Sequence, residues 1–387
     1  MSELLDNTNK KNSNSNAIEE HKEKTQMYST WGDKLLQHTD VLYDLQVNKK
    51  VRPITIQLAP VEACDSDCPF CSVAARPLKS KIPFEKIKKI LTDFKELGAK
   101  SLEITGGGNP MLYRDSYNGV NVNINDVIDF AHSIGYDIGI ITNTNDITKI
   151  LKQENYDKLK WLRISLIKLD EGKTPEDYNF GTFPQSKLAF SYIIYESTGE
   201  QPDPLSRTKK PYAGTNVDSI KKMAKLVSLF PNVKFVRIAG NCLIKGNNAS
   251  VRDKWKDVIN EIDINEKFFI KDIGNDDDPY NNGCYVGAVR PYIAPNPHNG
   301  GDYQVYICTS HVLNKRNYDL DYSLGSVDNI KEIWNSMSEN LKNNLPIYEV
   351  KNNCGKNWKE SCKFCYYKFN NKLLHTVINE MPDKNFP

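Results

Sequence analysis

The chain has 387 residues, enough for one large domain with a smaller one beside it or for two ordinary domains. With 51 basic and 49 acidic residues the formal net charge is +2, which does not indicate nucleic acid as a partner, although it would hide a local basic groove. No apolar run approaches the roughly 20 residues that cross a bilayer, and the N-terminus is polar from the start, so we expect a cytoplasmic protein with no membrane partner.

Residues 1–25 are rich in Asn, Lys, Ser and Glu and lack apolar periodicity, which predicts a disordered tail. Strands and helices alternate from residue 52 onward. The predicted strands cover 54–59, 101–105, 137–142, 161–166, 188–195 and 234–240. The helices predicted between them cover 84–97, 127–134, 147–156 and 217–227. This alternation predicts a parallel sheet with helical cover, either doubly wound or barrel-like, whose active residues gather at the C-terminal ends of the strands.

The pattern changes beyond about residue 265. Residues 285–307 read as a strand, a turn rich in Pro, Asn and Gly, and a second strand, which together predict a hairpin. Ser326 can cap a helix that follows it. We therefore expect a main α/β domain over 26–265, with residues 26–50 as its lead-in, and a small domain of hairpin plus helix over 266–387.

The nine cysteines are unevenly distributed. An odd number in a chain without a secretion signal argues against a disulfide scaffold and favours metal ligands. Three lie close together early in the chain, five lie beyond residue 280, and Cys242 stands alone. The early cluster has the spacing C-x3-C-x2-C and consists of Cys64, Cys68 and Cys71, with Phe70 before the last cysteine.

Three thiolates can hold three corners of a [4Fe–4S] cluster and leave the fourth iron open to a ligand, whereas clusters that only carry electrons normally have four. Zinc is the alternative. Zinc sites usually combine pairs of cysteines, and a third cysteine four residues upstream of the Cys68–Cys71 pair fits such a site poorly.

The triad, its aromatic residue and the preceding strand resemble the radical S-adenosylmethionine (SAM) superfamily over roughly residues 52–243. The resemblance implies a partial (βα)6 barrel of the TIM type, with a cluster on Cys64, Cys68 and Cys71 whose open iron binds SAM. It also implies reductive cleavage of SAM to methionine and a 5′-deoxyadenosyl radical, which abstracts hydrogen from a substrate.

Further positions match the family less completely. Gly107, Gly108 and Pro110 resemble its Gly-Gly-Glu-Pro motif, which holds the amino group of SAM, and Asn109 replaces the acid. An Asn carbonyl can still accept a hydrogen bond from an ammonium, without the charge. By the same resemblance, Asn143 and Ser165 at the ends of two predicted strands correspond to contacts with SAM ribose or carboxylate.

The distal cysteines predict a second metal centre. Cys284 and Cys308 bracket the hairpin, and Cys362 and Cys365 form a C-x2-C pair, a set that suits either zinc or a fully ligated [4Fe–4S] cluster. Here the hairpin, helix and cysteine pair resemble the Twitch or SPASM extension of radical SAM enzymes. This resemblance implies one auxiliary [4Fe–4S] cluster on these four residues, with Cys354 as a spare that could replace Cys284.

The sequence thus predicts a radical SAM enzyme that performs oxidation or bond formation. Its expected substrate is a peptide or protein side chain or a small molecule, and its expected electron donor is a flavodoxin or ferredoxin. Modification of a nucleoside or RNA base is an alternative within the family. A non-catalytic zinc-binding structural protein is the alternative of another class.

Overall fold

The computed structural model describes residues 23–29, 32–71, 78–197, 211, 213–241, 247–263, 266–271, 284–295, 303–309, 323–347 and 367–379. Most of the predicted tail and four of the cysteines, Cys242, Cys354, Cys362 and Cys365, lie outside these ranges. The predicted tail ends in residues 23–25, which the structure places in a helical turn running to residue 28.

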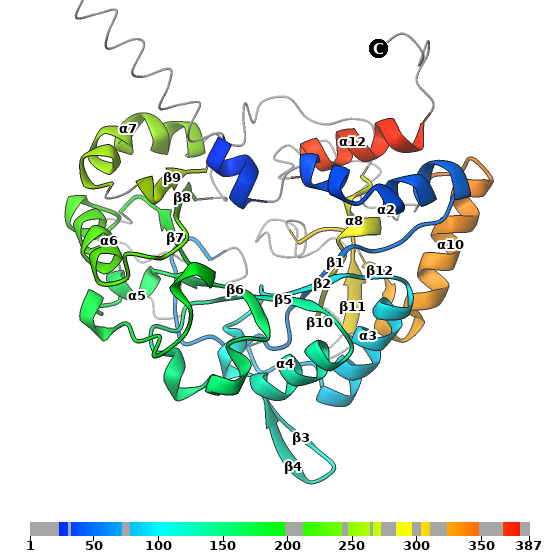
Figure 1. Ribbon diagram of the computed structural model, residues 1–387, viewed down its shortest axis with the longest axis horizontal. Helices are drawn as coiled ribbons and strands as arrows, with labels where there is room; N and C mark the ends of the chain where they lie inside the picture. The colour runs from blue at the N-terminus through cyan, green and yellow to red at the C-terminus, as the bar shows by residue number, and fades with distance from the viewer. Residues whose placement is uncertain are drawn as a thin grey trace, which may run out of the picture.

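A ten-stranded sheet has the order β12-β11-β10-β1-β2-β5-β6-β7-β8-β9. All six predicted strands are confirmed within it. The strands are β1 (Thr55–Leu58), β2 (Ser101–Ile104), β5 (Asp137–Thr142), β6 (Leu159–Ser165), β7 (Leu188–Ile194), β8 (Val236–Gly240), β9 (Phe268–Ile270), β10 (Tyr292–Pro295), β11 (Tyr303–Tyr306) and β12 (Ser323–Ser326). From β1 to β9 neighbouring strands are parallel, so their C-terminal ends meet at one edge. A separate antiparallel hairpin, β3 (Arg114–Tyr117) and β4 (Val120–Asn123), projects from the body (Figure 1).

Helices cover the convex side of the curved sheet (Figure 1). Alternate strand residues such as Ile56, Leu58, Ile138 and Ile140 are fully buried in one apolar cluster with the inner faces of the helices. The helices are α2 (Thr39–Tyr43), α3 (Phe84–Glu96), α4 (Ile124–Ser133), α5 (Ile167–Asp170), α6 (Val217–Leu229), α7 (Asn247–Ile262), α8 (Val286–Val289), α10 (Ile330–Lys342) and α12 (Lys368–Ile378). The result is a mixed α/β fold with a large, mainly parallel sheet.

The helix predicted over 147–156 is wrong. This segment forms two short 3-10 turns, η4 (Ile147–Lys149) and η5 (Gln153–Asn155). Between them, the backbone N–H of Lys152 donates to Asn125 Oδ1 at 2.9 Å. The buried side chain of Asn125 thus takes a donor that a continuous helix would need for its own ladder.

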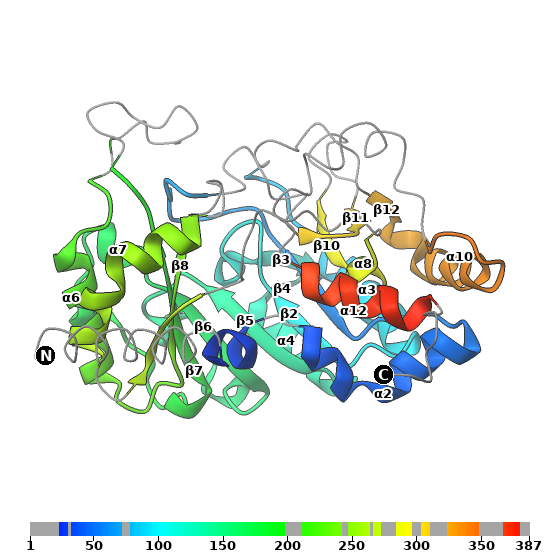
Figure 2. The ribbon, with the colours of Figure 1, turned by 90° about the horizontal axis from the view of Figure 1, so that it is seen from above.

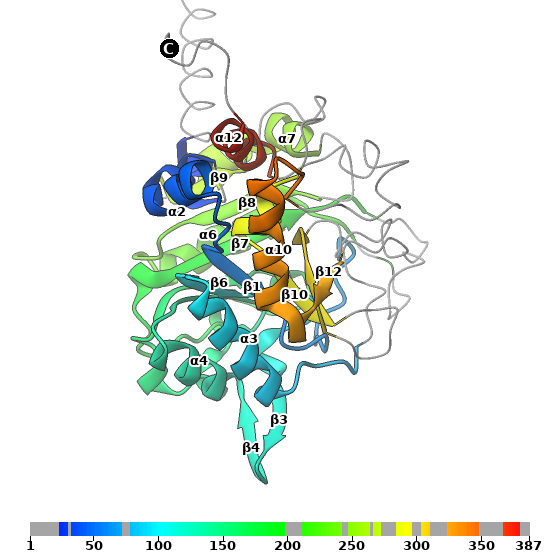
Figure 3. The same cartoon turned by 90° about the vertical axis from the view of Figure 1, so that its right-hand side faces the viewer.

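The predicted C-terminal hairpin is present and extends the main sheet, because β10 pairs in parallel with β1 (Figure 3). Its first strand begins later than predicted, since the short helix α8 precedes it. Ser326 caps the 3-10 turn η9 (Val327–Asn329), which leads into α10, by accepting a hydrogen bond from Asp328 N at 3.2 Å. Trp334 of α10 packs edge-on against Phe94 of α3, so the C-terminal elements share the main core.

The N-terminal turns lie beside the last helix. Helix α12 packs against the 3-10 helix η1 (Gly32–Gln37) and the π-helical turn η2 (Asp44–Asn48), so the two ends of the described chain meet (Figure 2). Within the described ranges, none of the helices combines the length and apolar character that a bilayer crossing requires.

Candidate functional site

The cysteine loop, residues 60–71, leaves the C-terminal end of β1. Cys64, Cys68 and Cys71 are each partly exposed, and Cys71 N donates to Cys68 O at 3.1 Å, which closes a tight turn between the last two cysteines. The three thiols thus lie on one loop at the edge of the sheet where parallel-sheet enzymes assemble their sites.

The glycine run after β2 packs directly on this loop. Gly108 N donates to Val61 O at 3.0 Å, and a Cβ added at Gly108 would lie 1.9 Å from Ala63 O. At Gly107, where φ is +54°, a Cβ would lie 2.6 Å from Glu62 Oε2. The glycines therefore allow one backbone to approach another, and they fix the cysteine loop against β2.

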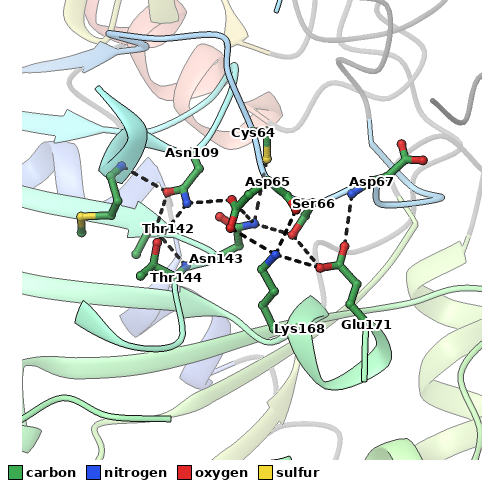
Figure 4. A network of polar contacts seen from close by, with 11 residues as sticks. Cys64, Asp65, Ser66, Asp67, Asn109, Thr142, Asn143, Thr144, Lys168 and Glu171 are labelled. Carbon is green, nitrogen blue, oxygen red and sulfur yellow. Dashed lines mark hydrogen bonds and ion pairs between the residues drawn. The ribbon is translucent and has the colours of Figure 1, made fainter. Parts of the chain in front are cut away.

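Asn109 ties the cysteine loop to β5 (Figure 4). Its Nδ2 donates to Asp65 Oδ1 at 3.0 Å and to Thr144 Oγ1 at 2.9 Å. Its Oδ1 accepts from Thr142 Oγ1 at 2.6 Å and from Met111 N at 3.2 Å. The side chain is buried, and its oxygen already has two donors. The structure therefore gives Asn109 a role in positioning the loop.

Asn143 comes from the end of β5 and reaches the same loop. Its Nδ2 lies 2.5 Å from Ser66 Oγ, 3.3 Å from Asp65 Oδ1 and 3.9 Å from Cys64 Sγ. Its Oδ1 is buried and has no hydrogen-bond partner, which leaves an acceptor beside the first cysteine. Ser165 lies half-buried at the end of β6, opposite Ser191 of β7, and belongs to none of these hydrogen bonds among the described residues.

Two charged residues after β6 hold the loop from the other side (Figure 4). Lys168 Nζ lies 3.2 Å from Asp65 Oδ2 and 2.9 Å from Glu171 Oε2. Glu171 accepts from Ser66 Oγ at 3.0 Å and from Asp67 N at 3.2 Å. The sequence analysis missed both residues and Asp65. The signal available was their place, since polar residues directly after a predicted parallel strand lie at the site edge.

The charges in this contact reinforce each other. Burial alone would raise the pKa of Asp65, but the amide of Asn109 and the ammonium of Lys168 outweigh it and lower that pKa. Burial alone would lower the pKa of Lys168, but Glu171 and Asp65 outweigh it and raise that pKa. Both groups therefore stay ionised around neutral pH.

Phe70 rests on an aromatic support from the end of β7. Its ring centroid lies 5.4 Å from that of Tyr195, whose hydroxyl donates to Asp170 Oδ2 at 3.2 Å. Tyr192 donates to the same oxygen at 2.8 Å. Burial raises the pKa of Asp170 despite these hydrogen bonds. The second half of the cysteine loop is thus anchored to β7 as the first half is to β5 and α5.

Of the predicted second centre, Cys284 and Cys308 fall within the described residues. Cys284 is half-buried just before α8, and Cys308 is buried just after β11. A Cβ at Gly287 of α8 would lie 2.7 Å from Ile307 Cα, so the segments carrying the two cysteines are in contact. Within the described residues, no three His, Cys, Asp or Glu side chains are arranged to hold a metal ion.

No protein-family model matches the chain, and no curated protein matches it either. Solved structures do. SuiB of Streptococcus suis bound to precursor peptide SuiA is 15% identical over 86% of this chain and 75% of that one, with a TM-score of 0.45. BtrN in complex with AdoMet and 2-DOIA is 12% identical over 80% and 92%, with a TM-score of 0.36. The enzyme anSMEcpe with bound AdoMet is 12% identical over 86% and 97%, with a TM-score of 0.41.

These neighbours agree with the predicted resemblance to radical SAM enzymes. At such low identities and TM-scores the likeness is distant. What the chain does is therefore argued below from its own residues.

Proposed function

We propose that this protein is a radical SAM enzyme. One observation carries the proposal: the C-x3-C-x2-C loop lies at the C-terminal edge of a parallel sheet and is held there by β2, β5, α5 and β7. The curved sheet with its outer helices supports a partial (βα)6 barrel. We further propose the domain division near residue 265 that the sequence predicts.

The donor set fits the cofactor. Three thiolates suit three irons of a [4Fe–4S] cluster. When bound there with SAM, such a cluster supplies reductive cleavage of SAM to methionine and the 5′-deoxyadenosyl radical. The chain's own residues position the loop: Asn109 and Lys168 fix Asp65, and Tyr195 supports Phe70.

Asn143 offers a contact for SAM itself. Its buried Oδ1 has no partner and lies on the amide whose nitrogen is 3.9 Å from Cys64 Sγ. Because this atom is an acceptor, it suits a donor group such as a ribose hydroxyl or an ammonium. Asn109 Oδ1, in contrast, is occupied, so we assign the amino group of SAM to other acceptors at this edge, among them the Asp65 carboxylate.

Anaerobic reconstitution of the full chain tests the proposal. We expect a brown protein with about eight irons for two clusters, which forms 5′-deoxyadenosine from SAM under reduction. Cys68→Ala should abolish 5′-deoxyadenosine formation, whereas Cys242→Ala, a matched substitution outside both predicted clusters, should not. A colourless protein with stoichiometric zinc, or turnover in Cys68→Ala, would refute the proposal.

The auxiliary cluster is a separate part of the proposal. The contact between the segments that carry Cys284 and Cys308 supports it. We expect Cys308→Ala to lower the iron content from about eight to about four and to leave SAM binding intact. If Cys354→Ala lowers it and Cys284→Ala does not, Cys354 is the ligand. Unchanged iron in all three variants would remove the auxiliary cluster.

Substrate and partners follow from the same proposal. We propose a peptide or protein side chain, or a small molecule, as substrate, and a flavodoxin or ferredoxin as electron donor. Transfer of deuterium from a labelled candidate into 5′-deoxyadenosine would identify the substrate. Transfer from a nucleoside or RNA base would instead establish the alternative.

A further inference from the structure

A cavity of about 610 Å³ lies at the opposite end of the sheet from the cysteine loop. Its walls include the first residues of three strands, Thr55, Ser101 and Asp137, and residues of the N-terminal segment from Met27 to His38. The proposed radical SAM site uses none of these residues.

The cavity carries an excess of positive charge. Its lining includes the basic residues Lys34, Arg163, Lys234, Arg237 and Arg290. Glu103 and Asp137 are its acidic residues. Arg290 occupies Glu103 at 2.7 Å, and Lys160 occupies Asp137 at 3.3 Å. Among the residues that the structure describes, no carboxylate forms an ion pair with the other four cations.

Several of these cationic atoms lack any partner. The Nε atoms of Arg163, Arg237 and Arg290 are buried and make no hydrogen bond within the described chain. Burial, and then the charge of Arg163, lower the pKa of Arg237. Burial, and then the charge of Arg290, lower the pKa of Lys34. Gathering like charges with unsatisfied donors is unfavourable unless an anion joins them.

The floor of the cavity is shaped to hold one of the arginines. The guanidinium of Arg163 lies 5.9 Å from the ring centroid of Trp161. The indole occupies the space in front of Gly139, where a Cβ would lie 2.1 Å from its Cε2 and Cζ2 atoms. The missing side chain at Gly139 therefore makes room for the ring beneath the guanidinium.

We propose that this cavity binds a small, multiply charged oxyanion of the phosphate or phosphate-ester class through Arg163, Arg237 and Lys34. Guanidinium groups present paired donors that match phosphate oxygens, and the ammonium adds a third positive charge. The site is independent of the proposed SAM chemistry, because it lies at the other end of the strands.

Calorimetric titration of the reconstituted full chain with pyrophosphate, inorganic phosphate and succinate, at constant ionic strength and without SAM, tests this site. We expect pyrophosphate and phosphate to bind more tightly than succinate. Arg237→Gln should weaken pyrophosphate binding at least tenfold. Lys342→Gln, which removes the same charge from the exposed surface of α10, should leave it unchanged.

Thermal unfolding without added anion gives a second readout. Because Arg237 is buried among like charges, Arg237→Gln should unfold at the same or a higher temperature than the wild type. Should this variant fail to fold, Lys34→Gln serves for the titration with the same expected loss of affinity. Absence of phosphate and pyrophosphate binding in the wild type, equal affinity in the folded variant, or tighter binding of succinate would overturn the proposal.

Discussion

The ammonium of Lys168 lies 3.2 Å from Asp65 Oδ2 and donates to the Asp65 backbone carbonyl at 3.1 Å. A residue from the turn after β6 thereby holds the loop after β1, across the breadth of the site. Lys168 is largely buried and Asp65 is about half exposed, so solvent screens the pair only in part. Such a contact fixes the position of the loop more than it stabilises the fold.

Lys168→Met should therefore impair the site more than the fold. We expect the dissociation constant for SAM to rise about tenfold, equivalent to about 1.4 kcal/mol, with a change in unfolding free energy of about 1 kcal/mol. Equilibrium SAM binding to the reconstituted protein measures the first effect. Lys173→Met, an exposed lysine five residues on, is the matched control. Equal SAM affinity in both variants would show that Lys168 does not position the loop.

The same pair predicts a pH dependence of stability. The pKa of Asp65 is lowered, so its contribution is present above the ordinary value of about 3.9 and is lost as pH falls through the lower folded value. The pKa of Lys168 is raised, so its contribution is present below about 10.4 and is lost as pH rises through the higher folded value. The difference in melting temperature between wild type and Lys168→Met should be constant from about pH 5 to 9 and shrink below about pH 4. A difference that changes through neutral pH would contradict this assignment.

Asn109→Asp would restore the acid of the family motif, yet we expect it to weaken the site. The Nδ2 group of Asn109 donates to Asp65 Oδ1 at 3.0 Å, and a carboxylate there would face the carboxylate of Asp65. Repulsion should lower both the melting temperature and SAM affinity. The double variant Asp65→Asn/Asn109→Asp, which exchanges the two groups, should recover about 1 kcal/mol of unfolding free energy. Tighter SAM binding in Asn109→Asp alone would show that the acid acts on SAM directly.

The sequence predicted the strands well because apolar residues mark a parallel sheet buried under helices. The helix over 147–156 was predicted wrongly because its pattern of apolar residues does not reveal that Asn125, far away in sequence, takes a backbone donor. At the site, the cysteines could be found from spacing alone. Lys168 and Glu171 could not, because their contacts join segments about a hundred residues apart and have no local pattern.

The cationic cavity shows the same limit. Arg163 and Arg237 alternate with apolar residues in β6 and β8, and a single charged residue in a strand indicates no cluster. Only the curvature and pairing of the sheet bring such residues to one cavity with Lys34 from the N-terminal segment. The nearly neutral net charge of the chain hides this local excess of positive charge.

The packing of the glycine run on the cysteine loop predicts that Gly108 is the least replaceable of these glycines. In Gly108→Ala the new methyl group would lie 1.9 Å from the carbonyl oxygen of Ala63, and a backbone atom cannot rotate away as a side chain can. The cysteine loop must shift, so we expect a loss of several kcal/mol of unfolding free energy and little iron uptake. Thermal unfolding and iron content after reconstitution measure the two effects.

Gly119→Ala separates this clash from backbone strain. Gly119 lies in the turn of the β3–β4 hairpin with φ of +77°, and a Cβ there would meet nothing within 4 Å. Its substitution should cost only the roughly 1–2 kcal/mol of a left-handed residue and leave the iron content unchanged. If Gly108→Ala loses no more stability than Gly119→Ala and still takes up iron at the wild-type level, the cysteine loop does not need the close backbone contact. The glycines would then serve a bound ligand instead.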